Sequence, residues 1–361
     1  MEKVLVIGGA TLDTIITYED METLIHQRHT SSQSYLLLEE GKKIEVLHQD
    51  VASGGGATNT AVAFKRQGYD VLLFCKLGRD LAGEAVLKEL QHYGLATDWI
   101  CYDDEIGTAT SFVVPSLKGD RAVFAYRGAN TNLLVEDMRL NEIKHCRFVY
   151  ITSLSRASAE QLPKIISAAA EHQVKVAINP GVSQLTHGAY VLKQSLNGID
   201  TLILNEEEAQ QLMVSLLLDD HGEAETKAAG AAKLTNSQTS FAQGYFNLRE
   251  FFQVVLSLGP QVVVVTNGSE GVYVATQSKL YFHKAPKINV VNTLGAGDAF
   301  GSGFTGALYQ GVPLPDAIRM GVLNSASVIQ HPDAKTGLLL RADFELGLQQ
   351  LDPTLLSELS W

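Results

Sequence analysis

The sequence contains little cysteine. Its three cysteines, Cys75, Cys101 and Cys146, are an odd number in 361 residues, and none has the spacing of a metal-ligand motif. This pattern excludes a disulfide framework and a common zinc motif, and it is typical of reduced thiols in the cytoplasm. We therefore expect a cytoplasmic protein whose fold does not depend on covalent cross-links.

Long hydrophobic runs are absent as well. The first apolar run, residues 4–7, ends at Gly8-Gly9, so it is too short for a secretory signal peptide. No later segment approaches the roughly 20 apolar residues of a membrane-spanning helix. We expect no membrane segment.

Positive charge is also scarce. The chain has 28 Lys and Arg residues against 40 Asp and Glu residues, which gives a formal net charge of −12. A surface of this sign disfavours nucleic acids and anionic membranes as partners, although it is compatible with a local positive pocket. The expected partner is a small-molecule substrate, with no nucleic acid and no membrane.

The residues that are present describe an α/β protein. Hydrophobic residues make up 45% of the chain, and 361 residues exceed the usual size of a single core, so we expect one large domain with a smaller appendage. Runs rich in Val, Ile and Leu without alternation predict buried parallel strands. These runs are 4–7, 71–74, 148–151, 174–178, 202–204 and 262–265.

Helical patterns lie between these strands. The patterns at 57–67 and 82–93 end at Gly68 and Gly94, which are suitable helix stops, and those at 159–172 and 206–218 follow the same logic. Alternating strands and helices predict a doubly wound α/β core.

Two regions break the alternation. Residues 12–50 hold candidate strands at 14–16, 34–38 and 43–47, and residues 108–127 hold a pair at 111–114 and 121–126 around a Lys118-Gly119-Asp120 turn. Together they predict a small β-sheet that protrudes from the core and covers the glycines at 54–56 as a lid. Residues 219–248 are polar and irregular, which predicts a surface excursion.

A Gly-Ala-Gly turn at 295–297 precedes Asp298 and the apolar segment 299–304. The first turn of a helix has unpartnered N–H groups and partial positive charge, and small residues let a ligand approach, so the turn predicts an anion site. Since like charges repel, a carboxylate at such a site needs a reason. We interpret Asp298 as a base that accepts the proton of an attacking hydroxyl. The simpler alternative is a helix-start carboxylate favoured by the dipole.

A second glycine cluster, Ser53-Gly54-Gly55-Gly56-Ala57-Thr58-Asn59, leads into the helix predicted at 57–67. Three adjacent glycines indicate a close ligand or an unusual backbone path, and the alternative is a flexible turn before a capped helix. The spacing is not that of a dinucleotide fingerprint, and a Walker A loop is also absent.

These two segments resemble the two signatures of the ribokinase-like (PfkB) carbohydrate kinases, in the family's order. Further segments similar to family motifs are Gly8-Gly9-Ala10-Thr11-Leu12-Asp13, Gly78-Arg79-Asp80-Leu81-Ala82-Gly83, Gly128-Ala129-Asn130, Asn205-Glu206-Glu207-Glu208 and Thr266-Asn267-Gly268-Ser269-Glu270-Gly271. The resemblance implies a ribokinase-like doubly wound, mostly parallel sheet with helices on both faces and a small β-sheet lid from about 12–50 and 108–127, within a kinase domain at 1–361.

The resemblance also implies the reaction, transfer of the γ-phosphoryl group of ATP to a hydroxyl of a small sugar. Asp298 would be the base, and the N–H groups of Gly295, Ala296 and Gly297 would stabilise charge on the phosphoryl oxygens. The sugar-binding candidates are Asp13, Gly54, Gly55 and Asn59. A carboxylate accepts two hydroxyl donors, and an Asn side chain both donates and accepts. A turn residue at Asp13 and a helix cap at Asn59 are the alternatives.

On the nucleotide side, the resemblance implies that Asn205 and Glu208 act through water on Mg²⁺, which prefers oxygen ligands. The alternative for this pair is a capped helix start with a solvated acidic face. Further candidates for the ATP site are Thr266, Gly268, Gly271 and, more weakly, Asn324. A turn after a buried strand would explain the two glycines equally well.

One position departs from the family. Asn292 stands where the family usually has an Asp that supports a monovalent-cation site. Asn keeps an oxygen acceptor but loses the negative charge, which argues against potassium activation. Arg127, where the second lid strand returns to the core, would either meet an anionic group of the substrate or close the lid with an ion pair.

Two other functions stay open, namely a nucleoside (adenosine-type) kinase of the same superfamily and a non-catalytic sugar- or nucleotide-binding relative. The first needs an apolar or aromatic wall for the base, and the presence of Asp298, Asn205 and Glu208 argues against the second. Because lid-to-lid dimers are common in the family, a homodimer through the lid is a further expectation. The sequence does not identify the acceptor.

Overall fold

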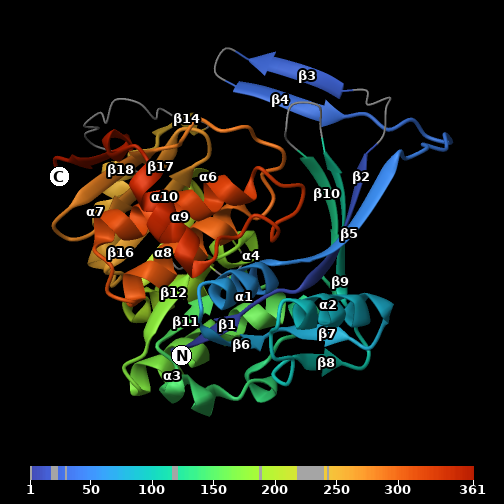
Figure 1. The fold of residues 1–361 in the computed structure, drawn as a ribbon, viewed down its shortest axis with the longest axis horizontal. Helices are drawn as coiled ribbons and strands as arrows, with labels where there is room; N and C mark the ends of the chain where they lie inside the picture. Colours follow the sequence, from blue (N-terminus) through green and yellow to red (C-terminus); the bar gives the residue numbers. More distant parts are fainter. Residues whose placement is uncertain are drawn as a thin grey trace.

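The computed structural model describes residues 2–17, 23–28, 31–115, 121–186, 189–217, 240–241 and 244–361. Within them, the largest sheet has nine strands in the order β19-β18-β17-β16-β13-β12-β11-β1-β6 (Figure 1). These are β1 (Lys3–Ile7), β6 (Asp70–Phe74), β11 (Phe148–Ile151), β12 (Lys175–Ile178), β13 (Thr201–Asn205), β16 (Val262–Asn267), β17 (Gly271–Ala275), β18 (Leu280–Lys284) and β19 (Leu356–Leu359).

The strands from β6 to β16 pair in parallel, whereas β17, β18 and β19 add antiparallel strands at one edge. All six sequence-predicted strands are therefore confirmed as the parallel part of the sheet. The antiparallel edge was not predicted. Its strands extend the sheet beyond β16, and β17 begins beside the carboxyl end of β16, where Gly271 pairs with Asn267.

Helices cover both faces of this sheet, as Figure 1 shows. The main helices are α1 (Gly56–Arg66), α2 (Leu81–His92), α3 (Leu162–Glu171), α6 (Glu206–Leu217), α7 (Leu248–Ser257), α8 (Ala296–Tyr309), α9 (Leu314–Val328) and α10 (Arg341–Gln350). In β1, Leu5 and Ile7 pack into one apolar cluster with α3, α6 and α7, while Val4 and Val6 pack into another with α1, α8 and α9. Burial on both faces explains why β1 reads as a continuous apolar run, and the doubly wound class is confirmed.

The predicted helix stops are also confirmed. Gly68 and Gly94 follow α1 and α2 with φ of +89° and +72°, a conformation that glycine adopts without strain. The helix predicted at 159–172 is divided, because a 3-10 helix at Arg156–Gln161 precedes α3 and Pro163 lies in the first turn of α3.

A separate four-stranded sheet projects from the core in Figure 1. Its order is β10 (Arg121–Tyr126), β9 (Ala109–Pro115), β2 (Thr11–Thr17) and β5 (His48–Gly54). A hairpin of β3 (Thr23–Arg28) and β4 (Ser31–Leu36) lies at its far end, and Leu36 packs there against Ile16 and Val114. We call the four-stranded sheet the small sheet.

Some details of this region differ from the prediction. The strand expected at 43–47 is not formed, since β5 begins only at His48, and the strand expected at 34–38 ends at Leu36. The Lys118-Gly119-Asp120 turn and most of 219–248 lie outside the described residues. The three cysteines all lie inside them and are free thiols. In the same part of the chain, no helix combines the length and the apolar character needed to span a bilayer.

Candidate active site

The carboxyl ends of the parallel strands meet at one edge of the large sheet, and the sequence-predicted residues gather there. β1 leads into β2, which carries Asp13, and β13 ends at Asn205, which lies in register with Thr266 of β16. Ligands of open α/β sheets bind beyond this edge. The arrangement therefore places acceptor and nucleotide candidates on the same side of the molecule.

Asp298 lies in the first turn of α8, half-buried against α1. Its Oδ2 accepts a hydrogen bond from Nδ2 of Asn59 at 2.8 Å, and Asn59 is only 5% exposed. Burial raises the pKa of Asp298, the Asn59 bond and the charge of Lys335 oppose this shift, and the charge of Asp13 adds to it. We call the Gly-Ala-Gly turn at 295–297 the anion turn. The carboxyl group of Asp298 thus links this turn to α1, the helix that carries the sugar-binding candidate Asn59.

The turn before Asp298 offers backbone donors. Among the described residues, the N–H groups of Gly297 and Asp298 have no protein acceptor, and neither does that of Gly295, whereas Ala296 donates to the carbonyl oxygen of Thr293 at 3.3 Å. A Cβ atom added at Gly297 would meet nothing within 4 Å. The helix N-terminus is therefore open to an anion, with the amide of Ala296 engaged within the turn.

Gly295 requires its glycine. Its φ is +76°, and an added Cβ would lie 2.5 Å from Cβ of Ala334. Backbone conformation and close packing both exclude a larger side chain here. The segment that contains Ala334 thus packs against the anion turn and supports its conformation.

Asp13 lies against the other glycine cluster. Its Oδ1 accepts from the Ser111 hydroxyl at 2.6 Å, and a Cβ at Gly54 would stand 1.8 Å from Oδ2. Burial raises the pKa of Asp13, Ser111 and Lys335 lower it, and Glu89 raises it further. Gly55 has φ of +91° and packs on the carbonyl oxygen of Gly9. The glycines therefore let the chain pass directly over the Asp13 carboxylate.

Two other motif side chains have structural partners. Asp80 caps α2 by accepting from the N–H of Gly83 at 2.8 Å, and it also accepts from the N–H of Thr108 at 2.8 Å. Asn130 bonds both backbone groups of Ala10, at 3.0 and 2.9 Å. Asp80 thus anchors the approach to β9, and Asn130 holds the turn that leads to Asp13.

Asn205 and Glu208 bond to each other's backbone. The N–H of Asn205 donates to Oε2 of Glu208, and the N–H of Glu208 donates to Oδ1 of Asn205, both at 2.8 Å. This reciprocal pattern is a capping box at the start of α6. Burial raises the pKa of Glu208, the bond from Asn205 opposes this, and the charges of Glu207 and Asp298 add to it. Glu208 therefore lies within the electrostatic reach of Asp298.

The magnesium prediction is chemically compatible with this pair. The capping bonds use the single side-chain oxygen of Asn205 and Oε2 of Glu208, and they leave Oε1 of Glu208 outside them. Oxygen atoms of this kind suit Mg²⁺ held through water. Among the described residues, no three His, Cys, Asp or Glu side chains form a cluster that could hold a metal ion directly.

The four nucleotide candidates divide into two kinds. Thr266 is half-buried near the end of β16, where its hydroxyl lies 3.5 Å from the Leu204 carbonyl oxygen. Gly268 has φ of +46° with open space around it, so the chain leaves room for a ligand there. Gly271 instead accommodates the His283 carbonyl oxygen, which an added Cβ would approach to 2.1 Å. Asn324 is fully buried and joins Ala299 to Leu339 by bonds of 2.7 and 2.9 Å. Strand pairing therefore explains Gly271, and packing of α9 against α8 explains Asn324.

Sequence reasoning missed three charged residues. Lys335 is 1% exposed, donates to the carbonyl oxygen of Ser53, and lies 3.7 Å from Oε1 of Glu89. Arg121, at the start of β10, donates to the Thr293 hydroxyl at 2.7 Å, so the small sheet reaches the anion turn. None of these three residues, Lys335, Glu89 and Arg121, stands in a recognisable motif.

Arg127, which the sequence had singled out, is exposed, and its Nη1 lies 3.4 Å from the Ser155 hydroxyl.

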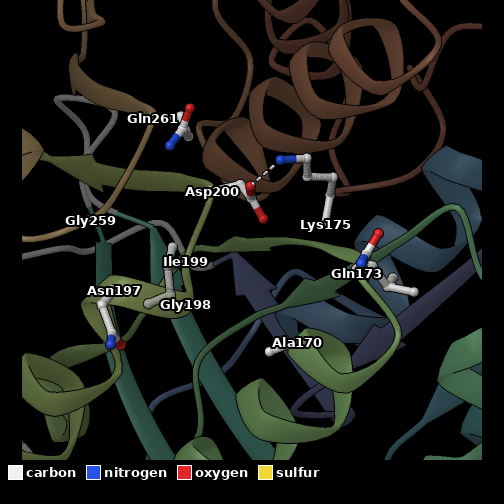
Figure 2. Close-up of a pocket in the computed structure, with 10 residues that line it drawn as sticks. Ala170, Gln173, Lys175, Asn197, Gly198, Ile199, Asp200, Gly259 and Gln261 are labelled. Atoms are coloured by element: carbon white, nitrogen blue, oxygen red, sulfur yellow. Dashed lines mark hydrogen bonds and ion pairs between the residues drawn. The ribbon is translucent and has the colours of Figure 1, made fainter.

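A hollow of about 230 Å³ lies at the other end of the parallel strands, beside their amino ends. Figure 2 shows its lining side chains, among them Lys175 and Asp200, whose ion pair measures 2.6 Å. These residues stand at the amino ends of β12 and β13. Since ligands of this fold class bind beyond the carboxyl ends, the hollow is not the candidate active site.

Known proteins identify the family. A family model described as pfkB family carbohydrate kinase matches residues 1–244 and 246–340. The ribokinase of Staphylococcus aureus is 26% identical over 345 residues, which cover 94% of this chain and 97% of that protein.

Solved structures share the fold. The Arabidopsis thaliana ribokinase complexed with ribose and ATP superposes with a TM-score of 0.73 at 20% identity, over 96% of this chain and 99% of that one. The Burkholderia thailandensis nucleoside kinase in complex with inosine superposes with a TM-score of 0.71 at 18% identity, over 96% and 98%. The family model spans nearly the whole chain, and the protein therefore belongs to the pfkB family of carbohydrate kinases, phosphotransferases with an alcohol group as acceptor.

Proposed function

We propose that the protein transfers the γ-phosphoryl group of ATP to a hydroxyl of a small sugar, with Asp298 as the base. One observation carries the proposal: Asp298 is bonded to Asn59 beside the acceptor glycines and stands at the open N-terminus of α8. A hydroxyl held by the acceptor residues and a phosphoryl group held by the helix would both adjoin this carboxylate.

The proposed mechanism assigns the proton and the charge separately. Asp298 takes the proton from the attacking hydroxyl, which Asp13 and Asn59 orient through neighbouring hydroxyls. The amides of Gly295 and Gly297 stabilise charge on the transferred group. When bound, Mg-ATP supplies the phosphoryl group together with a cation that offsets its charge. Glu208 and Asn205 would act on that cation through water, and Thr266 and Gly268 would border the nucleotide. Gly271 and Asn324 would support this side through the fold.

We further propose that residues 12–50 and 108–127 act as a lid. The small sheet carries Asp13 and Ser111 at its base, and Arg121 reaches Thr293 on the other side of the site. Closure of the small sheet over the space between its base and Thr293 would exclude water from the site and so limit the hydrolysis of ATP.

The test of the function is ADP release with Mg-ATP and a panel of sugars and nucleosides. We expect turnover with at least one sugar and a loss of most of that turnover in the Asp298→Asn variant. Turnover with nucleosides alone would favour the nucleoside-kinase alternative. Saturable sugar binding without ADP release would favour a non-catalytic binding protein, and both results contradict the proposal.

Potassium is expected to have little effect on this turnover. Asn292 accepts from the N–H of Leu294 at 2.9 Å and donates through Nδ2 to the Pro332 carbonyl oxygen at 2.8 Å. The side chain at this position is therefore neutral, and its oxygen and nitrogen both have protein partners. Replacing potassium with tetramethylammonium should change kcat/KM less than about twofold, and a loss of tenfold or more would show that the Asn292 argument is wrong.

We also propose a homodimer through the small sheet. Phe124, Phe112, Thr14 and Val51 form one row across it, and the three apolar members of the row are exposed. Because side chains alternate along a strand, this row lies on the face opposite Asp13. An exposed apolar row of this kind marks a protein interface. Sedimentation should show a dimer for the wild type and a monomer for Phe124→Glu, and a monomeric wild type would refute the proposal.

A further inference from the structure

Two charged side chains clamp the backbone of Ser53. The N–H of Ser53 donates to Oε2 of Glu89 at 2.5 Å, and its carbonyl oxygen accepts from Nζ of Lys335. The two side chains also lie 3.7 Å apart as an ion pair. Ser53 is the residue at which β5 of the small sheet turns into the glycine cluster. The clamp therefore fixes the path of Ser53-Gly54-Gly55-Gly56, which we call the acceptor loop.

The segment around Lys335 also contacts the anion turn. Ala334 packs directly against Gly295, and the Pro332 carbonyl oxygen accepts from Asn292. Asp333 holds the segment in shape by accepting from the N–H groups of Lys335 and Thr336, at 2.7 and 2.8 Å. Residues 332–336 thus touch both halves of the candidate site, with the acceptor loop on one side and the phosphoryl side on the other.

Lys335 is surrounded by carboxylates. Burial lowers its pKa, while the charges of Glu89, Asp13, Asp333 and Asp298 raise it, in that order. Glu89 lies on α2, Asp13 on β2, Asp333 on the same loop and Asp298 on α8, whereas β5 contributes the neutral carbonyl oxygen of Ser53. The negative charge of Asp13 adds to the raised pKa of Asp298, and the positive charge of Lys335 opposes the shift at both residues.

We propose that Lys335 is a positioning residue that holds the acceptor loop through Ser53 and supplies the buried positive charge shared by Asp13 and Asp298. This inference rests on the proposed function, because it concerns the acceptor and base residues of that reaction. The charge lets Asp298 stay unprotonated beside the ionised Asp13, so that both can act on the same acceptor at neutral pH. Glu89 holds the lysine in place and limits its effect on Asp13.

The acid limb of the pH profile of kcat/KM tests this assignment. In Lys335→Met the limb should move up by about one pH unit or more, because an opposite charge is lost. In Glu89→Gln, which keeps an acceptor for Ser53, the limb should stay or move down. The Lys335→Met/Glu89→Gln double variant removes a charge of each sign, so its limb should return toward the wild-type position. A merely structural role predicts that the double variant is worse than either single variant.

The free energy of unfolding gives a readout that does not depend on activity. Asp13 and Asp298 have folded-state pKa values above their unfolded values, so their contribution to stability falls as the pH rises through that window. Without Lys335 the folded values rise further. Between pH 5 and pH 7.5, the midpoint denaturant concentration should therefore fall more in Lys335→Met than in the wild type, and less in Glu89→Gln.

The outcomes separate the two proposals. An unchanged acid limb and an unchanged pH dependence of unfolding in Lys335→Met would overturn the role of Lys335 while leaving the kinase function intact. If no acceptor is phosphorylated, the proposed function fails, and the unfolding measurements alone decide about Lys335. If Lys335→Met does not fold, Glu89→Gln decides, and an acid limb that moves up in this variant would overturn the role of Lys335.

Discussion

Asp298→Asn should lower kcat by about 10³-fold while the protein keeps its fold and its acceptor affinity. The amide that replaces the carboxylate can still accept the hydrogen bond from Asn59, which measures 2.8 Å in the wild type. It cannot accept a proton at neutral pH, so only the proton transfer is lost. Steady-state kinetics with the best sugar gives kcat, and titration calorimetry gives the affinity for that sugar.

The pH profile provides a second measure of the same residue. Because burial raises the pKa of Asp298, the acid limb of wild-type kcat should lie above the ordinary range of an Asp, with activity falling as the pH decreases. The residual activity of Asp298→Asn should lack this limb. Glu207→Gln is the matched control, since it removes an exposed carboxylate from the same region and should change kcat less than twofold. Near-normal turnover of Asp298→Asn would remove the base assignment.

The large sheet could be predicted because its strands are buried on both faces. Runs such as 148–151 therefore contain apolar residues throughout, and the helices between them end at glycines. The antiparallel edge lacks this signal. β17 and β18 each have a half-buried aromatic residue at their centre, and β18 ends in His283 and Lys284. β19 joins this edge from the end of the chain, and no local pattern links Leu356 to His283.

Glycine spacing made a large part of the candidate site predictable. The two glycine clusters mark close approaches that their neighbours confirm, Asp13 at Gly54 and Ala334 at Gly295. Glycine spacing does not separate ligand contacts from packing contacts: Gly271, a candidate for the ATP site, accommodates the His283 carbonyl oxygen. Lys335 had no signal at all. It is a single lysine in a polar loop, and its partner Ser53 lies 282 residues earlier.

Gly54→Ala should raise the KM for the acceptor by roughly 10²-fold or more, because the added methyl group would occupy the place of the Asp13 carboxylate. An added Cβ would lie 1.8 Å from Oδ2 of Asp13, so the carboxylate must move away from the loop and from Ser111. A hydrogen bond to a charged group contributes about 1.5–3 kcal/mol, and Asp13 is proposed to make two of them to the sugar. The measurement is KM and kcat with saturating Mg-ATP.

Gly68→Ala is the control that separates this steric effect from the general effect of removing a glycine. Gly68 has φ of +89° with nothing within 4 Å of its Cβ position, so alanine there strains only the backbone at the end of α1. It should lower the stability by about 1 kcal/mol and leave the acceptor KM unchanged. If Gly54→Ala acts through Asp13, adding it to Asp13→Asn should raise KM little further, because the lost interaction is the same. Fully additive effects, or a wild-type KM in Gly54→Ala alone, would show that the acceptor is held elsewhere.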